Sequence, residues 1–161
     1  MRLDRTDFGI LEALQDNARL SNKELAAMVG VSPSTCLERV RRLRSQNVIR
    51  GFSADTDPKA MGIDVQALVA IRLDKHAQAS PEALKRSLLE LPEVRAVYVL
   101  AGVDDFLIHV VAASVDHLRE IVNQSFVGKP NVAHIQTSLI FDYGFSQKLP
   151  NLNEVNEAEE E

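Results

Sequence analysis

The sequence predicts an α+β protein in two parts, a winged-type helix-turn-helix domain followed by a ferredoxin-like βαββαβ domain. Two capped helical segments meet at Gly30, and the second carries many basic residues. Near Asp57-Pro58 the patterning changes, and from Val65 onward apolar strand segments alternate with amphipathic helical ones. We therefore place a helix-turn-helix domain with its linker at residues 1–62 and the ferredoxin-like domain at 63–149.

Two helices are expected before the turn. The first should cover Leu3 to Leu14, with an inward face formed by Phe8, Leu11 and Leu14. The second should begin near Ser21, because Ser21 and Glu24 have the spacing of a capping box. Gly30 should end it, since glycine adopts positive φ at little cost. Its apolar face should consist of Leu25, Met28 and Val29.

The third helix should begin after Ser32, a capping residue, with Pro33 at its first position, where a missing N–H does no harm. Cys36, Val40 and Leu43 recur at helical spacing and should form its inward stripe. The residues from Val48 to Ala54 are expected to form a short strand, and residues 57–62 a linker or a short helical turn.

Basic side chains concentrate on this third helix. Between Val31 and Gly51 there are five arginines and one acidic residue, Glu38. A run of charge is often only a solvated helix face, but here it lies on the second helix of a helix-turn-helix, the element that enters the DNA major groove. We expect double-stranded DNA to be contacted at base edges by Ser34, Thr35, Glu38 and Arg39, near the cap Ser32, and at phosphates by Arg41, Arg42 and Arg44.

Charge is distributed unevenly along the chain. The 161 residues carry a net charge of −5, yet residues 1–62 hold ten Lys and Arg against eight Asp and Glu. Residues 63–161 hold eight against fifteen, so the basic charge is focused on the helical part. Part of the acidity lies in residues 150–161, which we expect to be a disordered acidic tail.

The composition argues against a membrane protein, a secreted protein and a metal-binding protein. No apolar run reaches spanning length, and the first residues lack the apolar core of a signal peptide, so we expect a cytoplasmic protein without a membrane partner. The single cysteine, Cys36, forms no internal disulfide and should be a small core residue. The four histidines, His76, His109, His117 and His134, lack metal-ligand spacing, and we expect no metal and no cofactor.

The second domain reads as strand, helix, strand, strand, helix, strand. Strands are expected at Val65–Leu73, Val94–Leu100, Phe106–Ala112 and Val132–Phe141, with helices from Ser80 to about Leu91 and over Val115–Phe126. The central strands are apolar on both faces, whereas two helices cover only one face. A second copy of the chain is the simplest cover for the other, so we expect a symmetric homodimer.

The sequence resembles the Lrp/AsnC (feast/famine) family of bacterial and archaeal transcription regulators over about residues 2–145. In the first domain the resemblance rests on Leu3-Asp4-x-x-Asp7-x-x-Ile10-Leu11, Leu25-Ala26-x-x-Val29-Gly30-Val31-Ser32, Ser34-Thr35-x-x-x-Arg39-Val40-x-x-Leu43 and Val48-Ile49-x-Gly51-Phe52. In the second it rests on Gly102-x-x-Asp105-Phe106 and Val132-x-x-x-x-Thr137 before an apolar strand. Each motif alone is weak evidence for the family, but together, in this order and spacing, they are strong evidence.

The resemblance implies a regulatory (RAM) domain through which dimers form, commonly assembling to octamers. It also implies a small effector, usually an amino acid, bound between dimers at the turn Gly102, Val103, Asp104 and Asp105, with Thr137 and Ser138 as neighbours. A glycine turn exposes N–H groups to a carboxylate, and an acidic side chain can pair with an α-amino group. Gly102 should have to remain glycine if its φ is positive.

Other interpretations of the turn give different functions. Asp104 and Asp105 could be ordinary hairpin residues. Tandem aspartates also occur in two-metal nucleotidyl-transfer sites, but no phosphate-binding motif or third carboxylate accompanies them, so we expect no enzyme. Two functions remain: a ligand-responsive transcription regulator, and an effector-independent architectural DNA-binding protein of the same fold. The sequence names neither the effector nor the operator, nor whether transcription is activated or repressed.

Overall fold

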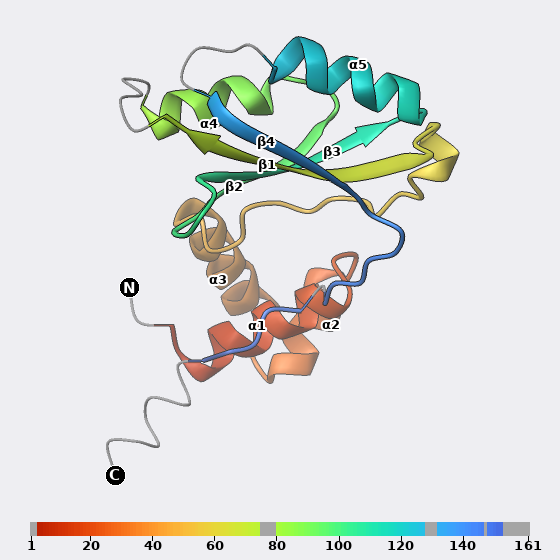
Figure 1. Cartoon of the computed structure of the whole chain (residues 1–161). Coiled ribbons are helices and arrows are strands. Elements are labelled where there is room, and N and C mark those ends of the chain that lie inside the picture. The colour runs from red at the N-terminus through yellow and green to blue at the C-terminus, as the bar shows by residue number, and fades with distance from the viewer. Residues whose placement is uncertain (1–2, 75–79, 128–131, 147, 153–161) are drawn as a thin grey trace. The chain divides into compact units, whose positions relative to one another are not determined.

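The chain divides into two compact units, which are described separately. The structure, a computed structural model, describes residues 3–74, 80–127, 132–146 and 148–152 (Figure 1). One unit holds the residues up to Ala54 and the segment that begins at Gly144, and the other runs from Asp55 to Tyr143. Both divisions fall earlier along the chain than the boundaries expected after residues 62 and 149. Most of the expected acidic tail, 150–161, lies outside the described residues.

The first unit begins with α1 (Arg5–Asp16). Asp4 caps it in a reciprocal arrangement, in which the Asp7 N–H donates to Asp4 Oδ1 at 2.9 Å and the Asp4 N–H donates to Asp7 Oδ2 at 3.2 Å. The buried residues of α1 are Asp7, Ile10 and Ala13. Among the residues expected to face inward, Leu11 and Leu14 pack against the core while Phe8 is half-buried outside it, because the inward face follows the i, i+3 spacing from Asp7.

The second helix, α2 (Asn22–Val29), has the predicted cap and stop. Ser21 and Glu24 form the capping box, and Gly30 ends the helix with φ +71°. Leu25 and Ala26 are its buried residues. Met28, expected to face inward, is 63% exposed, because α1 leaves its position uncovered.

The third helix, α3 (Pro33–Ser45), follows the predicted cap at Ser32 and buries Cys36 and Leu43, with Val40 packed beside them. The strand expected after it is absent: residues 48–54 form no strand in the structure. The N–H groups of Val48 and Ile49 both donate to the Leu43 carbonyl, so the chain turns at the helix end instead of pairing with a strand.

The second unit has the βαββαβ order that the sequence predicts. A short 3₁₀ turn, η1 (Lys59–Met61), precedes the first strand of this unit. The elements are β1 (Val65–Leu73), α4 (Pro81–Leu89), β2 (Val94–Val99), β3 (Phe106–Ala112), α5 (Val115–Ser125) and β4 (Val132–Leu139). The strand order is β2-β3-β1-β4, and each neighbouring pair is antiparallel. No helix of the described ranges is long and apolar enough to cross a membrane.

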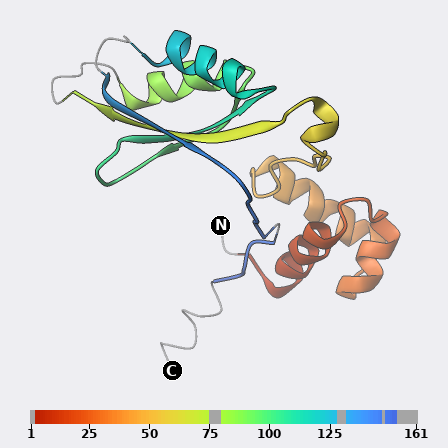
Figure 2. The ribbon, with the colours of Figure 1, turned by 45° about the vertical axis from the view of Figure 1, so that its right-hand side comes forward.

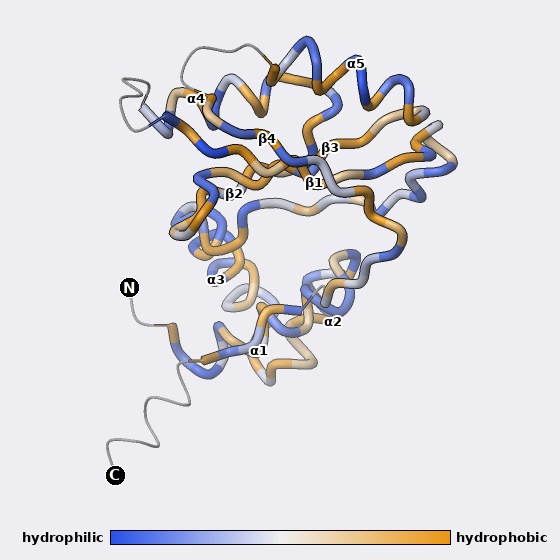
Figure 3. The backbone as a smooth tube through the Cα atoms, viewed as in Figure 1, coloured by the Kyte–Doolittle hydropathy of each residue, from blue (hydrophilic) through white to orange (hydrophobic). Residues whose placement is uncertain are grey.

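Both helices of this unit lie on one face of its sheet (Figures 1 and 2). The core between them is formed by strand residues that pair across β1 and β3, such as Val69 with Ile108 and Ile71 with Phe106, and by Leu118 and other helix residues. In Figure 3, α5 alternates between hydrophobic and hydrophilic turns, as expected of a helix that covers a sheet with one side.

The opposite face of the sheet carries the alternate residues of each strand. Toward β2 and β3 it is mostly apolar, with Tyr98 opposite Leu107 and Leu107 opposite Ala70. Toward the edge strand β4 it becomes polar, with Gln136 opposite Ala70 and Ser138 opposite Leu68. No helix of the second unit covers this face (Figure 2).

Candidate functional site

The outward face of α3 carries a polar stripe. Ser34, Glu38 and Arg41 follow one another at i, i+4 and i+7 and are all exposed. They lie opposite the buried stripe that begins at Cys36 and includes Leu43. Packing of the apolar side against α1 and α2 therefore turns this polar stripe to solvent.

Hydroxyl groups gather at the start of α3. The Ser32 Oγ lies 3.0 Å from Ser34 Oγ and 2.8 Å from Thr35 Oγ1, and it accepts the Thr35 N–H at 3.2 Å. The Asn22 side chain donates to the Pro33 carbonyl at 2.7 Å, which ties the start of α2 to the start of α3. These donors and N–H groups lie at a helix N-terminus, the end that favours anions such as phosphate.

Two of the predicted DNA-binding arginines are engaged within the unit. Arg39 Nη1 donates to Asp4 Oδ2 at 2.7 Å and to Asp7 Oδ1 at 2.8 Å. Arg42 Nη2 donates to both Asp7 oxygens, at 2.7 and 2.6 Å. The Arg39 guanidinium holds the pKa of the Asp4 carboxyl below its usual value, with the Asp7 N–H adding to the effect.

The other two predicted arginines of α3 are exposed and are not held by a carboxylate of the described residues. Arg41 and Arg44 make no ion pair with any described residue. Of the eight predicted DNA-contacting residues, the structure therefore brings Ser32, Ser34 and Thr35 together at the helix start and leaves the side chains of Glu38, Arg41 and Arg44 at the surface. It joins Arg39 and Arg42 to α1.

Asp4 and Asp7, which hold the two engaged arginines, were not among the predicted site residues. They entered the sequence prediction only as part of a motif, although Asp7 lies three residues before Ile10 on the buried side of α1. An acidic residue at an inward helical position requires a buried partner. That spacing was the signal that a cation elsewhere in the chain would fold onto α1.

The remaining nucleophilic and metal-binding candidates behave as core or surface residues. Cys36 is buried, and burial raises the pKa of its thiol. Among the described residues, no three His, Cys, Asp or Glu side chains lie close enough together to hold a metal ion. His76 lies outside the described residues.

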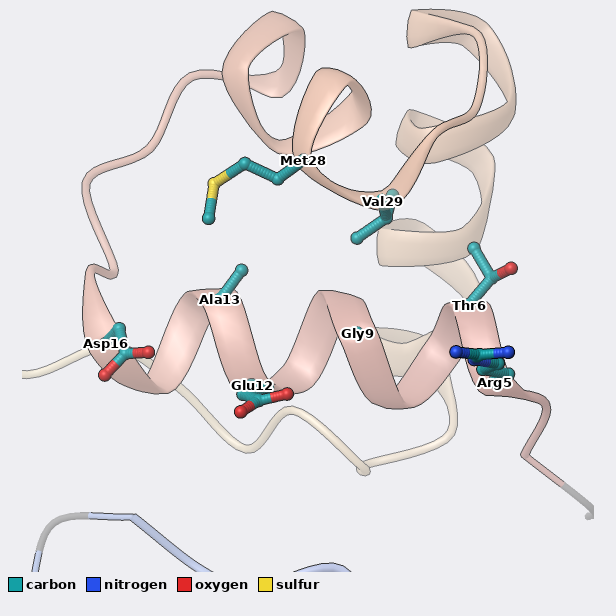
Figure 4. Close-up of a pocket in the computed structure, with 8 residues that line it drawn as sticks. All are labelled: Arg5, Thr6, Gly9, Glu12, Ala13, Asp16, Met28 and Val29. Carbon is teal, nitrogen blue, oxygen red and sulfur yellow. The ribbon is translucent and has the colours of Figure 1, made fainter.

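A groove of about 450 Å³ lies between α1 and α2 (Figure 4). Met28 and Val29 of α2 face Ala13 and Gly9 of α1 across it. A Cβ on Gly9 would approach Val29 Cγ1 to 3.3 Å, so this glycine permits the close approach of the two helices. The groove contains none of the predicted site residues.

In the second unit, the turn between β2 and β3 is tied to the end of β1. The Leu100 N–H donates to the Asp105 carbonyl at 2.9 Å, which closes the turn, and the Asp105 N–H donates to the Ile71 carbonyl at 2.9 Å. The Asp105 carboxylate accepts the Leu73 N–H at 2.7 Å. Asp105 therefore already has a structural partner, while Asp104 makes no hydrogen bond or ion pair with any described residue.

The backbone conformation at Gly102 does not require a glycine. Its φ lies outside the positive range, and a Cβ built on it meets nothing within 4 Å. The condition under which Gly102 would have to remain glycine, a positive φ, is therefore not met, because the Leu100–Asp105 hydrogen bond closes the turn without a left-handed residue. Val103, at the tip, is 76% exposed.

Thr137 and Ser138 lie on the edge strand β4, on the far side of the sheet from the β2–β3 turn. Successive strand residues point to opposite faces. Thr137, opposite Val69, lies on the helix-covered side, whereas Ser138, opposite Leu68, lies on the other. One chain thus does not bring these two residues together with the turn.

A histidine occupies the centre of the uncovered sheet face. His109 Nε2 lies 2.8 Å from Gln66 Oε1, and its ring meets the Tyr143 ring edge-on at 6.5 Å. Burial, with the nearby Arg95 charge, lowers the pKa of His109. The neutral imidazole is therefore the favoured form on this face.

Each of the two units matches a known protein family. Residues 3–50 match the winged helix-turn-helix DNA-binding family, and residues 66–143 match the Lrp/AsnC ligand binding domain. The chain is 45% identical to the HTH-type transcriptional regulator AldR of Mycolicibacterium smegmatis, over 88% of this chain and 82% of that protein. It is 34% identical to the leucine-responsive regulatory protein of Rhizobium meliloti, over 86% and 89%.

Solved structures show a similar fold along almost the whole chain. A transcriptional regulator from Neisseria meningitidis, solved in complex with L-Met, covers 96% of this chain and 99% of its own, with a TM-score of 0.84 and 28% identity. The AldR protein of Mycobacterium tuberculosis covers 92% and 100%, with a TM-score of 0.75 and 35% identity.

Proposed function

This chain belongs to the Lrp/AsnC family of effector-responsive, DNA-binding transcriptional regulators, and from that premise we propose which residues read DNA and which bind the effector. The family consists of regulators, and we propose no reaction for this chain. A regulator of transcription acts where the DNA lies, so we place it in the cytoplasm. The buried, unpaired Cys36 fits that compartment.

We propose that α3 reads DNA with its exposed stripe. The observation that carries this is the position of Ser34, Glu38 and Arg41 on the side of α3 opposite its buried stripe. A carboxylate accepts from the cytosine amino group in the major groove, and a serine hydroxyl pairs with several bases. Arg41 and Arg44 supply phosphate contacts, and the hydroxyl cluster of Ser32 and Thr35 adds contacts at the helix start.

The test of this DNA face compares operator with random DNA. Glu38→Ala should lower operator affinity by about 1–3 kcal/mol and relax base preference at one position. Arg44→Gln is the matched control, because loss of a phosphate contact should weaken operator and random DNA alike. Equal losses on both DNAs for Glu38→Ala would show that Glu38 reads no base.

We propose an amino acid as the effector, bound at the turn from Gly102 to Asp105. Supporting this, the turn presents exposed Val103 at its tip and, beside it, the Asp104 carboxylate, which makes no hydrogen bond or ion pair with any described residue. That carboxylate suits an α-amino group. Because Thr137 and Ser138 lie at the far edge of the same sheet, they would have to come from another protomer.

The effector site is tested with variants that leave the fold intact. Gly102→Thr adds a side chain where the unit has open space, so it should leave stability unchanged. If an amino acid occupies that space, the variant should lose the rise in melting temperature that a bound ligand gives. Asp104→Ala should weaken the same response. Full ligand responses in both variants would place the effector elsewhere.

We propose that the uncovered sheet face closes in a homodimer, and that dimers assemble further, to an octamer. The apolar side chains of Leu68, Leu107 and Tyr98, which lie on this face around His109, support this. A dimer also positions two recognition helices for a pseudo-palindromic site. Sedimentation should show no stable monomer at micromolar concentration, and Leu107→Glu should shift the chain toward monomer. A monomeric wild-type chain would contradict the proposal.

A further inference from the structure

Two acidic residues at the start of α1 hold two cations of the recognition helix. Asp7 is only 1% exposed and receives hydrogen bonds from both Arg39 and Arg42, at 2.6–2.8 Å. Asp4, at the surface, shares Arg39 through both of its oxygens. We name these four residues the α1–α3 clamp.

The clamp is costly to open. A buried carboxylate that loses its cationic partners keeps its charge in a poorly solvated site. In the described part of the chain every buried polar side-chain atom has a hydrogen-bond partner, and Asp7 obtains most of its partners from the two guanidinium groups. A DNA phosphate that approached Arg39 Nη1 or Arg42 Nη2 would have to displace a carboxylate that already accepts from that nitrogen, and the two guanidinium charges are already balanced by Asp4 and Asp7.

The two clamp arginines lie on a different side of α3 from the exposed stripe. Arg39 and Arg42 are one turn apart on α3 and reach α1, whereas Arg41 lies on the exposed stripe with Ser34 and Glu38. The side chains of Arg39 and Arg42 are still 24% and 42% exposed, but their charges are paired with Asp4 and Asp7, whereas Arg41 has no ionic partner among the described residues.

We propose that Asp7, assisted by Asp4, is a positioning residue for DNA recognition: it fixes α3 against α1 through Arg39 and Arg42 and withholds their charges from DNA phosphates. Withheld cations reduce the sequence-independent part of binding, which depends on the number of phosphates neutralised. Base readout by the stripe then accounts for a larger share of the affinity. The inference rests on the proposed DNA face only in taking Arg41 as a phosphate contact.

The first experiment measures the salt dependence of DNA affinity for three glutamine variants of the full chain. R41Q should reduce the slope of log K against log salt by about 0.9, the value for one phosphate contact. R39Q and R42Q should leave the slope unchanged and lower the melting temperature. A slope reduced by about one unit in R39Q or R42Q, with unchanged melting temperature, would overturn the inference. An unchanged slope in R41Q would contradict the proposed DNA face alone.

The second experiment opens the clamp from the acidic side. D4N keeps a good N-cap at the start of α1 and should weaken the hold on Arg39 alone. D7N should free both arginines, so affinity for random DNA should rise and the salt slope should steepen by up to about two units. A merely structural Asp7 would not steepen the slope. Unchanged random-DNA binding in a folded D7N would overturn the inference, and if D7N does not fold, D4N and the arginine variants decide it.

Discussion

Replacing Asp105 by alanine should lower the free energy of unfolding of the second unit even without a ligand. The Asp105 carboxylate accepts the half-buried Leu73 N–H at 2.7 Å, where the pairing of β1 with β4 shifts register between Arg72 and Leu73. Alanine leaves that N–H without its partner. A hydrogen bond to a charged group contributes about 1.5–3 kcal/mol, so the free energy of unfolding should fall by about that amount.

Native-state hydrogen exchange at Leu73 measures this loss directly. Exchange of its amide should become about 10- to 150-fold faster in D105A, since about 1.4 kcal/mol corresponds to a factor of ten. D105N keeps an acceptor oxygen and should show a smaller change, because a neutral hydrogen bond contributes about 0.5–1.5 kcal/mol. D104A is the matched control and should change stability by less than about 0.5 kcal/mol, since Asp104 has no partner among the described residues.

Equal exchange at Leu73 in D105A and D104A would refute this structural role. If the role is correct, a lost effector response in D105A reports damage to the turn as well as any lost ligand contact. Gly102→Thr and D104A are then the variants that isolate the ligand.

Four further changes test other parts of the structure. Gly30→Ala should cost about 1–2 kcal/mol, because Gly30 holds φ +71°, and thermal unfolding followed by circular dichroism should show it. Leu43→Ala, at a fully buried position of α3, should cost about 2–5 kcal/mol in denaturant unfolding. Because the pKa of His109 is lowered, its contribution to stability is complete above the ordinary value of 6.5 and is lost as pH falls through the lowered pKa; His109→Gln should remove that dependence. The Asp4 contribution should likewise be complete above the ordinary 3.8 and be lost at more acid pH, which acid unfolding of D4N against wild type would show.

The local signals of the sequence predicted most of the elements. Capping depends on residues within one turn, so Ser21 with Glu24 and Ser32 with Pro33 placed two helix starts correctly. The strands β1 and β3 also match their predicted bounds, because their apolar runs are bounded by turn residues.

The errors arose where burial depends on a neighbour. Met28 has the right spacing for the apolar face of α2, yet it lies at the groove between α1 and α2 and none of the described helices or strands buries it. Phe52 and its neighbours have strand composition, but the chain supplies them with no pairing strand among the described residues, and Phe52 is half-exposed.

The candidate site shows the same limit. Helical periodicity gave the outward stripe of α3 but could not show that Arg39 and Arg42 fold back onto Asp7, more than thirty positions earlier. Spacing likewise could not show that the Asp105 carboxylate accepts a hydrogen bond from the Leu73 N–H of β1. The functional value of a charged residue depends on its long-range partner, and a single sequence does not state that partner.

The most direct test of the account is a thermal-shift screen of the full chain against the twenty amino acids, paired with operator binding at saturating ligand. A ligand that binds the folded state raises its melting temperature by mass action and shifts assembly only by its difference in affinity between states. We expect at least one amino acid to raise the melting temperature and to change operator affinity, with both effects lost in Gly102→Thr. If none of the twenty changes either quantity while operator binding remains intact, the chain is not amino-acid-responsive and acts as an architectural DNA-binding protein of this fold.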